Sequence, residues 1–305
     1  MPTLLHCGLY FTPDHIKETL KHREREPLKA AWDALHTPVE NPWAAALLNA
    51  LRWRIAQDQT AGDVTVHALA RELFAGDVVS TGSERVAMLL TLAHIAELVR
   101  DHPHMGPSQW ADWSRAFAAQ VEAAQAETPT EINERLELAR LTLVSGIVLE
   151  HGDWFEAGAE IFRQTIRDEV RPAGYLESAV AIKDGGTFGR QFRATRSLVL
   201  MAEAAASSGV DLWSSEARGI SVTTAATYLI YYYYYPEKWK WEALTPEVSQ
   251  PLYTSEGGFL EMFYRRSRHK DMKLMLDDLR PVFDPSGGGL TTVTHAVGIR
   301  RGLFG

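Results

Sequence analysis

The chain has 305 residues, with 31 lysine or arginine and 39 aspartate or glutamate, so its formal net charge is −8 with histidine neutral. Hydrophobic residues make up 46% and charged residues 23%, an ordinary globular composition that can bury a large core. A single cysteine, Cys7, excludes an internal disulfide framework and a cysteine-built metal cage. The net acidic balance argues against nonspecific nucleic-acid binding.

No stretch approaches about 18 consecutive apolar residues, so the sequence predicts no membrane span. The N-terminal stretch MPTLLHCGLYFTPDH lacks the charged n-region and the long apolar h-region of a secretory signal. We therefore expect either a cytoplasmic protein or a secreted or periplasmic one whose leader has been removed.

Apolar residues recur at helical spacing along most of the chain. In the segment 83–101, Leu89 and Ala93 fall on one stripe and Leu92 and Ile95 on a second. A helix that is apolar on two stripes is covered on more than one side. The pattern predicts about eleven helices, at 14–24, 27–36, 42–58, 64–75, 83–101, 107–126, 131–151, 154–169, 188–208, 215–235 and 257–280.

Gly-Asp pairs mark several predicted helix ends. The run Phe74-Ala75-Gly76-Asp77 ends one helix, and Gly152 and Gly209 follow two others, where glycine can take the left-handed conformation and a following aspartate can cap the next helix. Alternation of period two is almost absent, and short connections favour antiparallel neighbours. We expect one all-α domain, 1–305, of stacked antiparallel helical hairpins. Two glycine-rich stretches, 171–187 and 284–305, are irregular and are candidates for function.

Most known catalytic motifs are absent. The sequence contains no P-loop and no GxGxxG, HExxH or GxSxG motif. His102 and His104 form an HxH pair, but no third ligand is evident, so the sequence predicts no metal site and no cofactor.

Basic residues gather in two clusters. Lys183, Arg190, Arg193 and Arg196 follow one another closely, and the three arginines share one ridge of a predicted helix. Such a ridge needs an anion or acidic partners over it, so it could bind the carboxylates of a substrate or pair with acids of the chain. A second cluster lies between Arg265 and Lys273, where a solvated face or salt bridges are the simpler interpretation.

Aromatic residues gather after residue 227. Tyr228, Tyr231, Tyr232 and Tyr235 share a helical face, and Trp239 follows. This pattern is typical of core packing with hydroxyls at a polar boundary. The alternative is a platform on which sugar rings stack.

Asn133 and Glu134 lie at the start of the predicted helix 131–151. Asparagine there can simply cap the helix, and a glutamate near an N-terminus is favoured by the helix dipole. A functional role for the pair is an equal alternative.

Several motifs together resemble the alginate lyase family, polysaccharide lyases with an (α/α) toroid. The matching stretches occur in the same order as in the family: Ile132-Asn133-Glu134-Arg135, Gly152-Asp153-Trp154-Phe155, Gly174-Tyr175-Leu176, Ser197 to Glu203, Gly209 to Trp213, Tyr232 to Trp241, and Gly257 to Arg265. The resemblance implies an (α/α) toroid or incomplete barrel.

The resemblance also implies β-elimination on a uronic-acid polymer such as alginate or a glucuronan. Asn133 falls on the position that neutralises the substrate carboxylate, and Glu134 replaces the family's histidine. Lys183 and Arg190 fall at or near the positions of the family's arginine and tyrosine. Other residues must then supply the base and the acid; the candidates are Tyr175, Tyr253, Tyr264, His94, His104 and His295. The expected substrate-binding residues are Lys183, Arg190, Arg193, Arg196, Tyr232 and Trp239.

Two alternatives stay open. A glycoside hydrolase on an (α/α) barrel would need two spaced carboxylates, Glu134 with Asp184 or Glu177. A noncatalytic protein that binds anionic oligosaccharides would use the arginines and tyrosines without forming product. In every case the expected partner is an anionic polysaccharide, not a nucleic acid or a membrane, and the sequence does not predict an oligomeric state.

Overall fold

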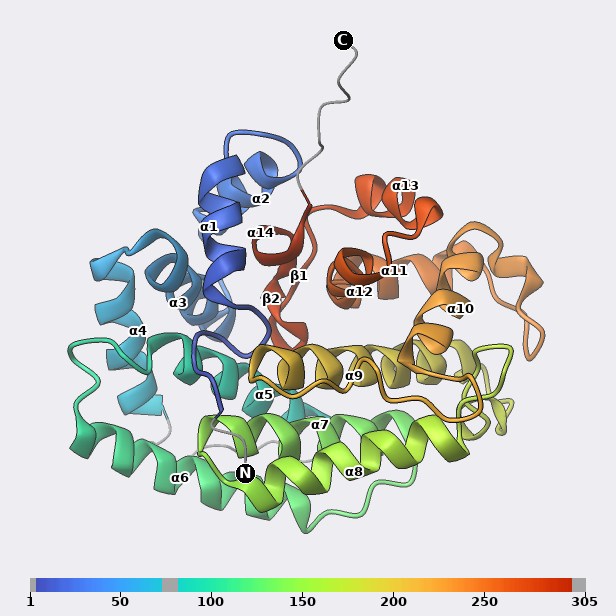
Figure 1. The fold of residues 1–305 in the computed structure, drawn as a ribbon, viewed down its shortest axis with the longest axis horizontal. Coiled ribbons are helices and arrows are strands. Elements are labelled where there is room, and N and C mark those ends of the chain that lie inside the picture. Colours follow the sequence, from blue (N-terminus) through green and yellow to red (C-terminus); the bar gives the residue numbers. More distant parts are fainter. Residues whose placement is uncertain (1–3, 73–81, 298–305) are drawn as a thin grey trace.

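The computed structural model describes residues 4–72 and 82–297 (Figure 1). Its first half consists of α1 (Pro13–His22), α2 (Leu28–Leu35), α3 (Pro42–Ala56), α4 (Gln59–Glu72), α5 (Gly82–Val99), α6 (Pro107–Gln125), α7 (Ile132–Val148) and α8 (Gly152–Asp168). The second half consists of η1 (Ser178–Val180), α9 (Thr187–Ser207), α10 (Val222–Tyr234), η2 (Pro236–Lys238), α11 (Pro246–Glu256), α12 (Phe259–Ser267), α13 (Lys270–Leu279), β1 (Phe283–Asp284), η3 (Pro285–Gly287), β2 (Gly289–Leu290) and α14 (Thr291–His295).

The helices form an (α/α) toroid, as the fold class predicted. The inner helices α3, α5, α7 and α9 each pack on the next, and α4, α6 and α8 cover them from outside. From α9 the contacts continue through α12 to α14, then through α1 and α2 back to α3, so the ring of contacts closes (Figure 1). The antiparallel pair β1–β2 and η3 pack against α3 and α5 inside this ring. That one domain spans 1–305 stays a prediction.

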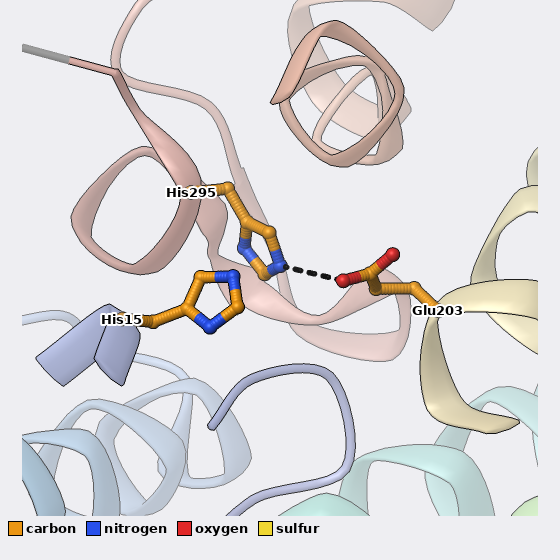
Figure 2. A group of neighbouring side chains, drawn as sticks. All are labelled: His15, Glu203 and His295. Atoms are coloured by element: carbon orange, nitrogen blue, oxygen red, sulfur yellow. Dashed lines mark ion pairs between the residues drawn. The ribbon is translucent and has the colours of Figure 1, made fainter. Parts of the chain in front are cut away.

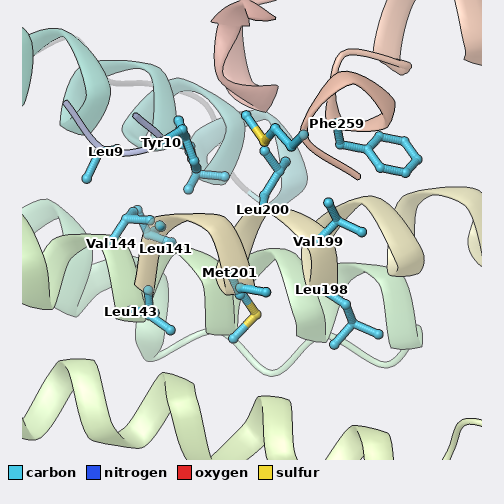
Figure 3. Close-up of a cluster of buried hydrophobic side chains, with 14 of the residues drawn as sticks. Leu9, Tyr10, Leu141, Leu143, Val144, Leu198, Val199, Leu200, Met201 and Phe259 are labelled. Atoms are coloured by element: carbon cyan, nitrogen blue, oxygen red, sulfur yellow. The ribbon is translucent and has the colours of Figure 1, made fainter. Parts of the chain in front are cut away.

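The burial of the inner helices follows from their two apolar stripes. In α5, the residues from Leu89 to Val99 are all buried. Leu141, Leu143 and Val144 of α7 and the run Leu198–Met201 of α9 lie in one buried layer (Figure 3). The outer helix α8 instead buries one stripe, as expected for a helix with solvent on one side.

Some predicted boundaries are wrong. The segment 215–221 precedes α10 in turns and a capping box, and the predicted helix 257–280 is two helices, because Arg268 takes a left-handed backbone conformation with φ 53°. The structure also adds α11, which has Pro246 in its first turn and Pro251 inside, and α14, within a stretch expected to be irregular. The prediction for Phe74 to Asp77 lies outside the described residues.

The predicted left-handed glycine is present after one helix, but another residue takes that conformation after a second helix. Gly209 after α9 has φ +90°, as predicted for a glycine beyond a helix C-terminus. After α7, Glu150 takes the left-handed conformation with φ 54°, while Gly152 begins α8 and His151 caps it. Among the described helices, none is both long and apolar enough to cross a membrane.

The close contact between α7 and α8 depends on Gly146. A Cβ atom placed there would lie 2.7 Å from the Cα of Phe155, in the backbone of α8. We expect Gly146→Ala to lower the free energy of unfolding by about 2–3 kcal/mol, because the two helices must separate. Urea unfolding measures the change.

Gly189→Ala in α9 is the matched control. A Cβ there meets nothing closer than an Arg193 nitrogen at 3.9 Å. This variant should gain up to about 1 kcal/mol from the higher helix propensity of alanine. Equal changes in the two variants would contradict the assignment of Gly146 as a contact glycine.

Candidate functional site

A cavity of about 370 Å³ lies between the first turns of α5 and α7 and the end of α6 with the connection that follows it. Ser83 of α5 and Glu134, Glu137 and Leu138 of α7 contribute to its lining. We call this cavity the mouth cavity. The N-terminal ends of both helices favour negative charge on this side. Three carboxylates of the chain, those of Glu127, Glu134 and Glu137, already line the cavity, and the Gly82 N–H donates to Glu127 over 2.9 Å.

Asn133 and Glu134 lie in the first turn of α7. Glu131, not Asn133, is the N-cap residue, and Asn133 caps nothing. The Asn133 side chain is 8% exposed and its Oδ1 is buried without a hydrogen-bond partner. Ser83 Oγ donates to Glu134 Oε1 over 3.2 Å. A buried amide oxygen without a partner costs free energy, which marks this position as a candidate for binding a ligand.

Arg190 lies in the first turn of α9 and forms ion pairs with acidic residues of the chain. Its guanidinium donates to Asp184 over 2.8 and 3.1 Å and to Glu131 over 3.3 Å. The hydrogen bond from Arg190 lowers the pKa of Asp184 to about 2. Arg190 also donates to the carbonyls of Ala179 and Ile182, so it fixes the glycine-containing loop before α9. Of the four predicted basic residues in this cluster, Lys183 alone is exposed with no ion pair within the described residues.

Arg193 and Arg196 are also paired within the chain. Arg193 donates to Glu256 over 2.7 Å and is about half-buried. Arg196 is buried and donates to Asp284 over 2.7 and 2.8 Å and to Glu137 over 3.2 Å. Burial alone would lower the pKa of Arg196, but the two carboxylates outweigh it and raise the pKa. The ridge therefore has acidic partners from the chain over it, one of the two outcomes expected from its spacing.

Arg196→Met should lower the free energy of unfolding by about 3–5 kcal/mol, because it leaves two buried carboxylates without their cation. Arg193→Met should change it by less than about 1 kcal/mol, because that pair is partly in water. Guanidinium unfolding of the two variants beside the wild type measures the difference. A small effect of both substitutions would show that the buried pair does not hold the fold together.

A fully buried polar group lies deeper along the axis. His94 of α5 has its ring centroid 5.1 Å from that of Tyr10, and the Tyr10 hydroxyl and both His94 ring nitrogens have no hydrogen-bond partner. Arg140 of α7 is equally buried, and it forms a long ion pair of 3.8 Å with Glu137. Burial lowers the pKa of His94 to about 3 and raises that of Tyr10. His94 is thus neutral and enclosed.

The depressed pKa of His94 makes stability depend on pH. The unfolded chain binds a proton on this histidine below pH about 6.5, whereas the folded chain does so only near 3. The folded state therefore loses stability as pH falls through this range, by about 3 kcal/mol between pH 7 and pH 4. His94→Leu should remove this contribution, so its unfolding free energy should fall less steeply with acid. Parallel pH profiles for the two proteins would refute the assignment.

The predicted aromatic platform is divided between the core and the surface, since Tyr231 and Tyr235 are exposed. Tyr232 and Trp239 are buried, with Tyr232 Oη donating to Tyr228 Oη over 3.1 Å and Trp239 Nε1 donating to Thr187 Oγ1 over 2.9 Å. Tyr175 is half-buried, with its ring centroid 4.9 Å from that of Trp241. Core packing thus accounts for Tyr232 and Trp239, in agreement with the simpler interpretation of this pattern.

The other candidate acids and bases are dispersed. Tyr264 is half-buried, with the Arg280 guanidinium 5.9 Å from its ring centre. Tyr253 is buried, and its hydroxyl donates to the Leu229 carbonyl over 2.7 Å. His295 is buried beside α9, and His104 lies on the surface at the end of α5. Asn133 and Glu134 are neighbours in α7. The structure does not place the candidate tyrosines and histidines beside them.

Sequence reasoning missed three residues. Glu137 lies one helical turn after Asn133, and the spacing of four could have placed it on the same face. Asp284 and Asp63 come from distant segments and leave no local signal. Asp63 supplies the third potential ligand that the HxH pair seemed to lack, since its Oδ1 lies 2.7 Å from His104 Nδ1 and 3.5 Å from His102 Nε2. A second such group, His15, Glu203 and His295, is shown in Figure 2.

No known family model and no curated protein sequence matches the chain. Solved structures do match. Alginate lyase A1-III from a Sphingomonas species superposes with a TM-score of 0.73 at 13% identity, over 90% of this chain and 78% of that one. A variant of A1-III complexed with a tetrasaccharide gives 0.71 at 14%, over 87% and 80%. An alginate lyase from Bacteroides ovatus gives 0.69 at 12%, over 96% and 100%. This likeness shows that the chain shares the fold of these alginate lyases.

Proposed function

We propose that the protein is a polysaccharide lyase that cleaves a uronic-acid polymer by β-elimination, as a divergent member of the alginate lyase family. The observation that carries the proposal is the unpartnered Oδ1 of Asn133, the residue before Glu134 of the mouth cavity, in a toroid that resembles alginate lyases, one of them complexed with a tetrasaccharide. A cavity of about 370 Å³ has room for a sugar unit and little more.

The reaction requires three contributions. Asn133 Nδ2 donates to the C6 carboxylate and stabilises the negative charge that develops there, which makes the C5 proton more acidic. The unpartnered Oδ1 of Asn133 is an acceptor and can bind a hydroxyl of the substrate. A base removes the C5 proton, the C4–C5 double bond forms, and the bond from C4 to the glycosidic oxygen breaks. An acid then protonates the leaving oxygen. Glu134 is the nearest candidate base, and Lys183 is the exposed cation that can bind a neighbouring uronate.

A noncatalytic binding protein is the second candidate. It is favoured by the pairing of Arg190, which falls near the family's tyrosine, with Asp184 and Glu131. An arginine so engaged cannot act as a base. The proposed hydrolase pairs gain less support, since Asp184 is held by Arg190 and Glu177 forms an ion pair with Arg171.

The deciding experiment is a far-ultraviolet absorbance time course on polymannuronate, polyguluronate, glucuronan, hyaluronan and pectate. Elimination creates a double bond conjugated to the carboxylate, which hydrolysis does not. We expect a rise on one of the polymers, and Asn133→Ala and Glu134→Gln should each reduce kcat by about 100-fold or more. Glu122→Gln, at an exposed position on α6, is the control and should leave the rate unchanged.

The other outcomes separate the alternatives. New reducing ends without absorbance would identify a hydrolase and overturn the lyase proposal. Binding of a polymer in calorimetry with neither signal would identify a binding protein. If Asn133→Ala weakened binding and turnover equally, the amide would stabilise the bound substrate and the transition state to the same extent. This result would contradict its proposed role in catalysis.

A further inference from the structure

A second polar group lies at the opposite end of α9 from Arg190. His15 of α1, Glu203 of α9 and His295 of α14 each bring one possible ligand atom to within 4.8 Å of the others (Figure 2). Glu203 and His295 are fully buried. Two imidazoles and a carboxylate gathered from three distant segments form a donor set suited to a transition-metal cation.

The hydrogen bonds of His295 leave Nε2 facing the group. Its Nδ1 lies 2.7 Å from Thr294 Oγ1, and that hydroxyl donates to the Thr291 carbonyl, so Oγ1 can accept the Nδ1 proton. A ligating histidine usually donates its other ring N–H in this way. Nε2 lies 3.6 Å from Glu203 Oε1 and 2.9 Å from the Tyr10 carbonyl oxygen. A cation bound to Nε2 would replace the proton that this nitrogen donates to Tyr10.

The His15 ring is held through its Nδ1 by Thr12. The Thr12 backbone N–H donates to Nδ1 over 3.1 Å, and Thr12 Oγ1 lies 2.9 Å from it. A cation bound to Nε2 would require the tautomer in which Nδ1 carries the proton and donates it to Thr12 Oγ1, in place of the hydrogen bond from the Thr12 N–H. The two histidine ring centroids are 5.0 Å apart, and Figure 2 shows one ring nitrogen of His15 turned toward His295 and Glu203.

Glu203 is oriented by partners outside the group. Its Oε2 accepts from Trp213 Nε1 over 2.9 Å and from Arg266 Nε over 3.1 Å. Its Oε1 accepts from Arg266 Nη2 over 3.3 Å and lies 3.6 Å from His295 Nε2. Arg266 is the positive charge closest to the carboxylate, but its side chain is 44% exposed, so water screens it. Arg265 is neutralised by Glu18 at 2.7 Å.

We propose that His15, Glu203 and His295, with the Tyr10 carbonyl oxygen as fourth donor, form a structural site for a divalent transition cation of the zinc type. Such a site joins α1, α9 and α14, the elements through which the ring of helices closes. Two nitrogen and two oxygen donors suit four-coordinate zinc. This inference does not depend on the proposed lyase activity.

The group of Asp63, His102 and His104 is the less suitable one. The His104 side chain is largely exposed, and the backbone N–H of His104 donates to His102 Nδ1 over 3.2 Å. The Asp63 side chain is also partly exposed, whereas the Glu203 carboxylate of the proposed site is buried. This group therefore serves as the control for surface binding.

The test uses the whole protein after treatment with a chelator. Titrated Co²⁺ should give the visible absorption bands of a four-coordinate ion at one equivalent, and Zn²⁺ should displace it. Zn²⁺ should also raise Tm by about 5 °C and change the fluorescence of Trp213, which bonds to Glu203. His15→Ala should abolish all of these responses, whereas His104→Ala should keep them.

Each other result contradicts the proposal. Bands that survive in His15→Ala and vanish in His104→Ala would place the ion at the surface group. Octahedral Co²⁺ spectra, or no spectral and no thermal response in the wild type, would show that the three residues form only hydrogen bonds and an ion pair. If His15→Ala fails to fold, His15→Gln and Glu203→Gln supply the same comparison.

Discussion

The buried ion pairs of Arg196 hold the toroid together across its axis. Arg196 belongs to α9, Glu137 to α7 and Asp284 to β1, so three distant parts of the chain meet at one guanidinium. Removing charges from water is costly, and the gain comes only while every partner is present. Gly287 belongs to the same arrangement, because a Cβ there would collide with the Asp284 carboxylate and lie 2.9 Å from Arg196 Nη2.

The spacing of apolar residues predicted much of the fold, because it indicates which faces of each helix are buried. The inner helices are apolar on two stripes, and their burial requires an outer layer, which α4, α6 and α8 supply. The pattern fails where tertiary contacts outweigh local preference. Pro251 sits inside α11, and Arg268 adopts a left-handed conformation that separates α12 from α13. Neither follows from the spacing of apolar residues.

The candidate site was predictable only in part. The spacing of Arg190, Arg193 and Arg196 correctly places all three on one helix, α9. Their partners include Glu256 and Asp284, which are 63 and 88 residues away from the arginines they bind, so no local signal could reveal that the ridge is neutralised. For Asn133, the sequence predicted a position at the helix start, but its unpartnered oxygen depends on the packing of neighbouring helices.

The contact between α1 and α14 has a consequence for folding. The hairpins α3–α4, α5–α6 and α7–α8 join segments that are adjacent in sequence, and such contacts cost little loop entropy. By contrast, the hydrogen bond of His295 to the Tyr10 carbonyl spans 285 positions. Because the entropy lost on closing a loop rises with the length of the loop, this contact costs more to form than a hairpin contact does. Contacts between residues so far apart in the sequence slow folding, whereas the hairpins form without this cost.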